Sequence, residues 1–80
     1  MTGNDIEKEI ITIIADLTGY DTSEITMETN IVKDLDVDSI KAIEITVAIE
    51  KKYKIKVRDE DVPRIVSVNQ AVDLVKKLLV

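Results

Sequence analysis

Several residue types are missing from this chain of 80 residues, and their absence excludes most of the common chemistries. With no cysteine the chain has neither disulfides nor a thiol of its own, and with no histidine it lacks the most frequent general base. This removes most zinc chemistry and the Cys–His and Ser–His nucleophile pairs. Phenylalanine and tryptophan are also absent, so the core is expected to consist mostly of isoleucine, valine and leucine.

Basic residues are scarce in the first half of the chain. Residues 1–40 carry ten acidic and two basic side chains, whereas residues 41–80 carry six acidic and nine basic ones. The net charge of −5 argues against a nucleic-acid partner, because phosphate binding needs a basic surface. We expect the acidic half to dock on basic surfaces of other proteins.

Long apolar runs are missing as well, so no membrane span is predicted, and no signal-peptide pattern follows Met1. The length corresponds to one small domain over residues 1–80. We expect a free-standing cytoplasmic protein and a monomer.

The spacing of the apolar residues predicts helices rather than strands. Near the start of the chain, isoleucines recur at helical spacing up to Leu17, and strict alternation fails wherever two of them are adjacent. Asn4 and Glu7 form a capping-box pattern at the beginning of this run, and Gly19 is a natural stop after it. We therefore predict a helix over residues 5–18.

Later segments carry further helix signals. One helix is predicted from Ser39 to about Tyr53, and another follows a capping box formed by Ser67 and Gln70. Residues 54–58 alternate like a strand but have no second strand to pair with, so we expect an extended connector. Residues 59–64 can form a short helical turn, because proline is tolerated in a first turn. The last helix is predicted to bury Val68, Ala71, Val72, Val75, Leu78 and Leu79.

Residues 19–38 form a long predicted loop, and such loops in small domains are usually functional or contain hidden structure. Asp21 to Glu24 can cap a short helical turn within it. The residues expected to anchor the loop on the core are Ile25, Met27, Ile31, Val32 and Leu35. Together these segments predict an all-α fold: a small four-helix bundle with three main helices, one short helix and a long loop between helices one and two.

The helix predicted over residues 39–53 has apolar residues on two nearly opposite faces. One face carries Ala42, Ile45, Ile49 and Tyr53. The other carries Ile40, Ile43 and Val47. A helix in a small bundle normally buries one stripe. Either this helix is central and buries both faces, or the second stripe is exposed and forms a partner surface.

Three aspartates alternate just before this helix. Asp34-x-Asp36-x-Asp38 begins like the calcium loop of an EF-hand, in which oxygens at positions one, three and five bind the ion. The continuation does not fit, because position six is Ser39 instead of glycine and position twelve is Ile45 instead of glutamate. We therefore predict no dedicated metal site, and only weak binding of divalent ions by the clustered carboxylates.

Ser39 lies where the helical pattern starts. Asp38 is a good N-cap, since its carboxylate can accept from the free N–H groups of the first turn. The serine hydroxyl should then lie near the surface, which is a suitable point for attaching a group. A catalytic serine is disfavoured, because no histidine or lysine pattern is present to activate it. The pattern leaves a simpler role open, in which Ser39 only helps to start the helix.

The surroundings of Ser39 resemble the acyl carrier protein family over nearly the whole chain. Asp34-Leu35-x-x-Asp38-Ser39 is similar to the modification loop of the family, and Ala48-Ile49-Glu50 with Tyr53 is similar to the end of its second helix. Asp59-Glu60-Asp61 matches its short third helix, and Ile65-x-Ser67-Val68-x-x-Ala71-Val72 the start of its last helix. An Asp-Ser pair alone would be weak evidence for the family. Found in a chain of this length and charge, with this order of helices, the pair is a strong signal.

The resemblance implies that the chain is a carrier and not an enzyme. A phosphopantetheinyl transferase would use coenzyme A and magnesium to attach 4'-phosphopantetheine covalently to Ser39, with Asp38 as the helix cap that orients the complex. The magnesium belongs to the modifying enzyme. The attached thiol would carry acyl groups as thioesters for fatty-acid, polyketide or related lipid biosynthesis, which supplies the thiol that the chain lacks.

The resemblance also implies docking surfaces for partner enzymes that load and process the acyl group. Their basic surfaces would face four carboxylates, which are Asp34, Asp36, Glu44 and Glu50. The apolar centre of this surface would be Ile40, Ile43 and Val47. The aliphatic core would part to admit the acyl chain.

Two features depart from the family pattern. The family usually has Gly-x-Asp-Ser-Leu, whereas this chain has aspartate at position 36 and isoleucine at position 40. Aspartate tolerates a left-handed backbone better than most residues, so we expect the loop to be preserved. The second departure is charge: Lys41, Lys51 and Lys52 lie within the second helix and Lys54, Lys56 and Arg58 follow it, which favours a specialised pathway over the housekeeping one.

Two other functions stay open at this stage. One is a carrier of aminoacyl or peptidyl groups, against which Asp38 argues, because such carriers more often have glycine before the serine. The other is a helical interaction domain or calcium-binding domain that carries no group.

Overall fold

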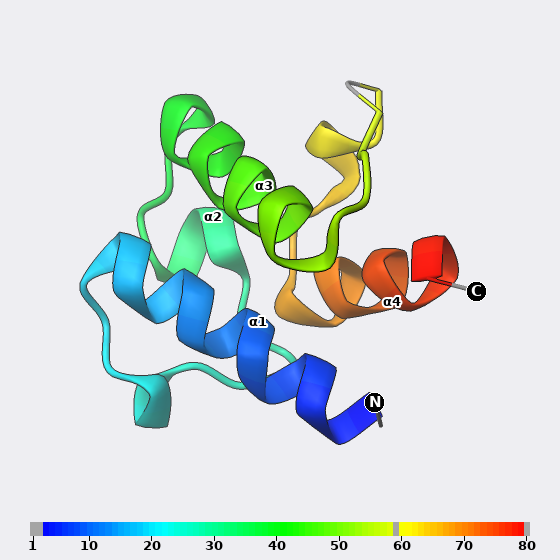
Figure 1. Cartoon of the computed structure of the whole chain (residues 1–80). Helices are drawn as coiled ribbons and strands as arrows, with labels where there is room; N and C mark the ends of the chain where they lie inside the picture. Colours follow the sequence, from blue (N-terminus) through cyan, green and yellow to red (C-terminus); the bar gives the residue numbers. More distant parts are fainter. Residues whose placement is uncertain (1–2, 59, 80) are drawn as a thin grey trace.

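The computed structural model, which describes residues 3–58 and 60–79, confirms the all-α fold (Figure 1). Its long helices are α1 (Gly3–Thr18), α3 (Ser39–Tyr53) and α4 (Val68–Leu79). Shorter helices are η1 (Thr22–Glu24), α2 (Ile31–Asp34) and η2 (Val62–Arg64). No strand is found in these two ranges, and a single isolated antiparallel bridge joins Asn30 and Ser67.

The ends of the helices follow the sequence signals, with one exception. α1 begins at Gly3, so Asn4 lies inside the helix and the predicted cap at Asn4 was wrong. Gly19 ends α1 as expected: its φ of 82° is left-handed, and its N–H donates to the carbonyl of Ala15 at 2.9 Å. The capping box before α4 is confirmed, because the Ser67 Oγ accepts from the Gln70 N–H at 3.3 Å. The Gln70 Oε1 in turn accepts from the Ser67 N–H at 3.0 Å.

The loop between α1 and α3 contains more helix than we predicted. η1 follows the capping box of Asp21 and Glu24, and both halves of that box are formed. α2 was not predicted. Its N-cap is Asn30, whose side-chain oxygen accepts from the Lys33 N–H at 2.8 Å, while the Asp34 carboxylate accepts from the Asn30 N–H at 2.9 Å. A helix of four residues is too short to give a recognisable period.

Backbone hydrogen bonds fasten this loop to the start of α4. The Ile31 N–H donates to the Val66 carbonyl at 2.7 Å, and the Val68 N–H donates to the Thr29 carbonyl at 3.1 Å. The Asn69 N–H donates to the Met27 carbonyl at 2.9 Å. The loop is thus held against α4 by its backbone, and it presents α2 beside the start of α3 (Figure 1).

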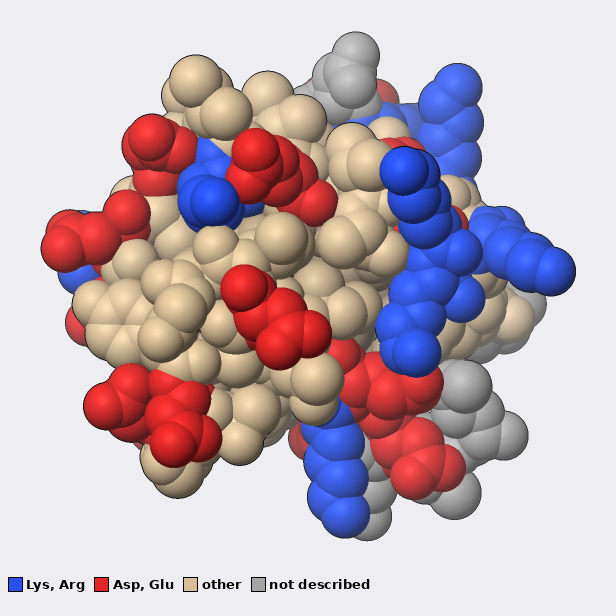
Figure 2. All heavy atoms as spheres, turned by 60° about the vertical axis from the view of Figure 1, so that its left-hand side comes forward, with Lys and Arg blue, Asp and Glu red and all other residues tan. Residues whose placement is uncertain are grey.

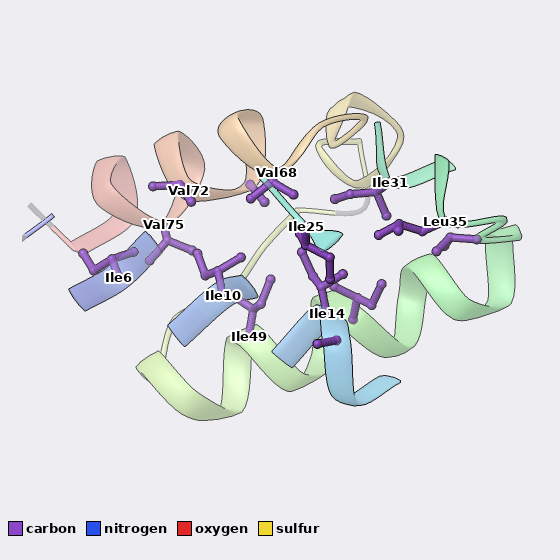
Figure 3. Close-up of a cluster of buried hydrophobic side chains, with 14 residues drawn as sticks. Ile6, Ile10, Ile14, Ile25, Ile31, Leu35, Ile49, Val68, Val72 and Val75 are labelled. Atoms are coloured by element: carbon purple, nitrogen blue, oxygen red, sulfur yellow. The ribbon is translucent and has the colours of Figure 1, made fainter. Parts of the chain in front are cut away.

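The core is aliphatic and lies between the long helices (Figure 3). Its fully buried side chains come from α1 and α4, which face each other, and are Ile10, Ile14, Val68, Val72 and Val75. α3 contributes Ile45 and Ile49, which are 3% and 2% exposed. Leu78 and Leu79 were expected in the core but are exposed, because the last turn of α4 runs past it.

The chain after α3 follows the prediction in outline. Residues 55–58 belong to no helix or strand, and η2 begins at Val62 with Pro63 in its first turn. The predicted turn began at Asp59, which lies outside the described residues. No helix in the described part of the chain has both the length and the apolar character that crossing a membrane requires.

Candidate functional site

Asp38 caps α3 as predicted and thereby fixes the position of Ser39. The Asp38 backbone is extended, with φ −85° and ψ −179°, and its carboxylate accepts from the Lys41 N–H at 2.8 Å. Its carbonyl accepts from the Ala42 N–H at 2.9 Å, which is the first bond of the helix. Ser39 is the first helical residue and is exposed. A rigid helix start therefore presents the serine hydroxyl at the surface.

An apolar pocket of about 510 Å³ lies directly beside Ser39. Three stretches of the chain meet around it: α2 with the loop after it, the first turns of α3, and η2 with the residue after it. Its apolar lining residues are Val32, Val37, Ala42, Ile43, Val62, Pro63 and Ile65. Apolar pockets with a few polar groups at the rim are typical of sites for small ligands.

The pocket reaches toward the core between α3 and η2. A second space of about 10 Å³ shares Ala42, Val62 and Ile65 with it and is lined on its other side by the core residues Ile45 and Ile49. These three shared side chains thus separate the pocket beside Ser39 from the interior of the bundle.

The second apolar stripe of α3 is exposed, which decides between the two arrangements that the sequence left open. Ile40 is 68% exposed, Ile43 55% and Val47 39%, whereas Ile45 and Ile49 on the other face are buried. The stripe begins next to Ser39 and runs along the outer face of the helix. Neighbouring large apolar side chains left in water are typical of a surface that binds a partner.

The three aspartates before α3 are exposed and have separate structural roles. The Asp34 carboxylate accepts from the Asn30 N–H, and the Asp38 carboxylate caps α3. Asp36 has a left-handed backbone with φ 52°, at the position where the family that the sequence resembles has glycine. Among the described residues, no group of three or more metal-binding side chains is placed to hold an ion.

Glu44 and Glu50 were both predicted to face partners, and the structure places them differently. Glu44 is exposed and forms an ion pair with Lys41 at 3.0 Å. Glu50 is half-buried, and its carboxylate accepts from the Val57 N–H at 2.8 Å. The carboxylate of Glu50 is therefore already engaged within the chain.

Sequence reasoning missed part of the pocket wall. Val32 was expected in the core but is 46% exposed and lines the pocket. It follows the buried Ile31 on α2, and two adjacent helical residues point about 100° apart, so Val32 faces outward. The sequence carried no signal for this, because α2 is too short to be recognised from its period. Val62 and Pro63 were missed for another reason, since their place in the wall depends on how the chain returns after α3.

Charge is unevenly distributed over the surface. Figure 2 shows acidic side chains spread over most of one face and basic ones gathered mainly in a band at one side. The exposed lysines at the end of α3 and just after it are Lys51, Lys52, Lys54 and Lys56. The end of α3 near Ser39 is thus the acidic one, and the other end is basic.

The sequence pattern of the family described as "Phosphopantetheine attachment site" matches residues 8–75. Curated relatives agree. A meromycolate extension acyl carrier protein of Mycobacterium leprae is 41% identical over 78 residues, which are 98% of this chain and 68% of the relative. An acyl carrier protein of Rhodococcus erythropolis is 39% identical over 77 residues, which are 96% of this chain and 85% of the relative.

Solved structures give the same result. An acyl carrier protein from Enterococcus faecalis superposes with a TM-score of 0.82 at 28% identity, over 98% of this chain and 99% of that one. The apo doublet acyl carrier protein from prodigiosin biosynthesis superposes with a TM-score of 0.81 at 26% identity, over 92% of this chain and 36% of that one. The chain belongs to the acyl carrier protein family, whose members have a phosphopantetheine attachment site.

Proposed function

We propose that this chain carries acyl intermediates as thioesters on a phosphopantetheine arm attached to Ser39. The observation that supports this most is the position of Ser39, which is exposed at a capped helix start beside an apolar pocket of about 510 Å³. A group attached to this hydroxyl projects from a fixed point and has an apolar recess within reach. The chain positions and shelters the attached group, and partner enzymes carry out the reactions on it.

Attachment of the arm requires a phosphopantetheinyl transferase that uses coenzyme A and holds its own magnesium. The Ser39 oxygen forms the new bond to the phosphorus of the pantetheine half, and the adenosine bisphosphate of coenzyme A leaves. The serine proton passes to the transferase. Asp38 caps the helix in this scheme and so orients Ser39, with its Oδ1 accepting from the Lys41 N–H.

Partner enzymes dock on the acidic end of α3. Asp34, Asp36 and Glu44 are exposed there, and Ile40, Ile43 and Val47 form the apolar centre. Exposed charges favour fast, weak and salt-sensitive association, which suits a carrier that visits several enzymes in turn. Glu50 is half-buried and one of its carboxylate oxygens binds the Val57 N–H, so we expect it to contribute less to docking than the three exposed acids.

We further propose that the pathway is one of lipid biosynthesis and that the chain works as a cytoplasmic monomer. The names of the mycobacterial relatives refer to meromycolate extension. The pocket and the aliphatic core next to it suit an apolar cargo better than an aminoacyl group.

The experiment is phosphopantetheinylation followed by mass spectrometry. Incubation with coenzyme A, magnesium and a promiscuous transferase should add one phosphopantetheine to the chain. Ser39→Ala should abolish this gain, whereas Ser23→Ala and Ser67→Ala, which replace the other two serines, should keep it. A wild-type chain that stays unmodified with several transferases contradicts the carrier function.

A further inference from the structure

We propose that Glu50 is a positioning residue that holds η2 in place and so preserves the pocket beside Ser39 that shelters an attached acyl chain. The inference rests on the proposed function, because the pocket can shelter an acyl group only if one is attached at Ser39. Glu50 lies near the other end of α3, about 16 Å along the helix from Ser39 at 1.5 Å per residue. It therefore acts through the chain that connects α3 with η2.

Three hydrogen bonds join Glu50 to the connector that follows α3. Its backbone carbonyl accepts from the Lys54 N–H and, at 3.2 Å, from the Ile55 N–H. Its carboxylate accepts from the Val57 N–H at 2.8 Å. Val57 is only 6% exposed, and hydrogen bonds between a charged acceptor and a backbone N–H are among the strong ones. One residue thus sets the direction in which the chain leaves α3.

The connector leads directly to the pocket wall. η2 follows the connector in the chain and lies beside α3 (Figure 1). The Arg58 carbonyl accepts from the Asp61 N–H at 2.9 Å, and the Ile65 N–H donates to the Val62 carbonyl at 3.1 Å. Val62 and Pro63 then form the side of the pocket that faces α3.

A three-residue helix has little stability of its own, so η2 depends on what holds it at either side. The side toward α4 is secured by the bridge between Asn30 and Ser67. The side toward α3 is secured at Val57 by the Glu50 carboxylate. Loss of that carboxylate should let η2 move away from α3, which widens the pocket and weakens its shelter of an attached group.

The test uses the protein carrying an acetyl or an octanoyl group on the phosphopantetheine, prepared from acetyl or octanoyl coenzyme A with a promiscuous transferase. The rate at which hydroxylamine cleaves each thioester measures how well it is sheltered. The short acetyl group serves as the internal reference, because it is too small to fill the pocket. Glu50→Ala removes the acceptor, Glu50→Gln keeps an oxygen acceptor of the same shape, and Glu28→Ala is the matched control at an exposed glutamate.

In the wild type the octanoyl thioester should react more slowly than the acetyl thioester. Glu50→Ala should remove most of this protection, by a factor on the order of ten, since a lost hydrogen bond to a charged group changes an opening equilibrium by about that much. Glu50→Gln should restore most of it, and Glu28→Ala should keep all of it. A purely structural role would lower the melting temperature but leave the octanoyl-to-acetyl ratio unchanged, and that result would overturn the proposal.

Amide hydrogen exchange of the unmodified protein provides a readout that needs no cargo. The Asp61 and Ile65 amides, which are bonded within the wall, should exchange about tenfold faster in Glu50→Ala than in the wild type and the Gln variant. Unchanged exchange contradicts the role of Glu50 even if Ser39 is modified normally. Failure of the wild type to accept phosphopantetheine instead contradicts the proposed function, so the two failures are distinguishable.

Discussion

The two ends of α3 use the same local devices and serve different purposes. At each end a residue other than glycine has a left-handed backbone: Asp36 with φ 52° shortly before the helix and Lys54 with φ 55° at its C-cap. At each end a carboxylate accepts a backbone N–H, at Asp38 from Lys41 and at Glu50 from Val57. The first end is acidic and opens on the pocket, whereas the second is basic and tied down.

Helix caps and left-handed residues therefore do not by themselves mark a functional site. They set where the chain turns, and both ends of α3 need them. What distinguishes the Ser39 end is the combination of an exposed hydroxyl, exposed apolar side chains and an adjoining pocket. What distinguishes the far end is anchorage: Glu9 of α1 binds the Lys52 ammonium at 3.1 Å and the Tyr53 hydroxyl at 3.3 Å.

The largest expected difference between the two ends of α3 is in the rate of phosphopantetheinylation after charge is removed at one end or the other. The double change Asp34→Asn and Asp36→Asn keeps a hydrogen-bond acceptor at residue 34 and a residue that tolerates the left-handed backbone at residue 36. It should lower the kcat/KM of phosphopantetheinylation about tenfold at low salt, because steering of a basic transferase is lost. The difference should shrink as salt is added.

The matched control for this pair lies at the far end of α3. Lys51→Gln with Lys54→Gln changes the net charge by the same amount in the opposite sense, away from Ser39. With both doubles compared at about 0.1 M salt, it should change the rate of modification by less than about twofold, because the screening length is then about 10 Å and these lysines lie about 18 Å or more along α3 from the serine. Equal effects of the two doubles would mean that overall charge, and not the acidic end, controls docking.

Glycine at the two left-handed positions is expected to raise stability by different amounts. Lys54→Gly should stabilise the fold by about 1 kcal/mol, because the left-handed backbone costs a residue with a Cβ about that much. Asp36→Gly should gain about half as much, since aspartate tolerates this region better. The measurement is the denaturant midpoint of each variant.

Alanine at the same two positions separates the backbone effect from the loss of charge. Lys54→Ala removes the ammonium but keeps a Cβ, so it should bring no gain. Asp36→Ala should be less stable than the wild type. A gain in Lys54→Ala equal to that in Lys54→Gly would show that relief of charge repulsion, and not of backbone strain, stabilises that end.

Much of the fold could be predicted because its signals are local. The bounds of α3, the cap at Asp38 and the box between Ser67 and Gln70 follow from side-chain type and a 3.6-residue period. The period also showed two apolar faces on α3, but only the structure shows that the second face is exposed. The left-handed backbone at Asp36 was anticipated from the residue that stands where the family has glycine.

The features that the sequence did not show depend on distant contacts. α2 has only four residues and is held by hydrogen bonds to the start of α4, which no pattern along the chain shows. The engagement of Glu50 depends on a turn seven residues later, where the chain brings back the Val57 N–H. The pocket wall at Val62 and Pro63 depends on the same turn. An acidic residue that binds a partner and one that holds the fold together cannot be distinguished from the sequence alone.

The smallest expected effect concerns the anchor at the far end of α3. Burial, together with the negative charge of Glu9 and the hydrogen bond to it, raises the pKa of Tyr53 from 10.0 to about 12. The folded state therefore favours the neutral phenol. The stability that this contributes is fully present below pH 10 and is lost as the pH rises from 10 to about 12.

Tyrosinate absorbance isolates this step, because lysines that lose charge in the same range do not absorb. The chain has two tyrosines, so Tyr53→Phe leaves Tyr20 as the one remaining phenol. The step near pH 12 should be present in the wild type and absent in Tyr53→Phe. At neutral pH the variant should lose no more than about 1 kcal/mol, the value of one hydrogen bond. Persistence of the high-pH step in Tyr53→Phe would show that Glu9 does not anchor α3 through this hydroxyl, and that the far end is tied down by the Lys52 ion pair and the Glu50 carboxylate alone.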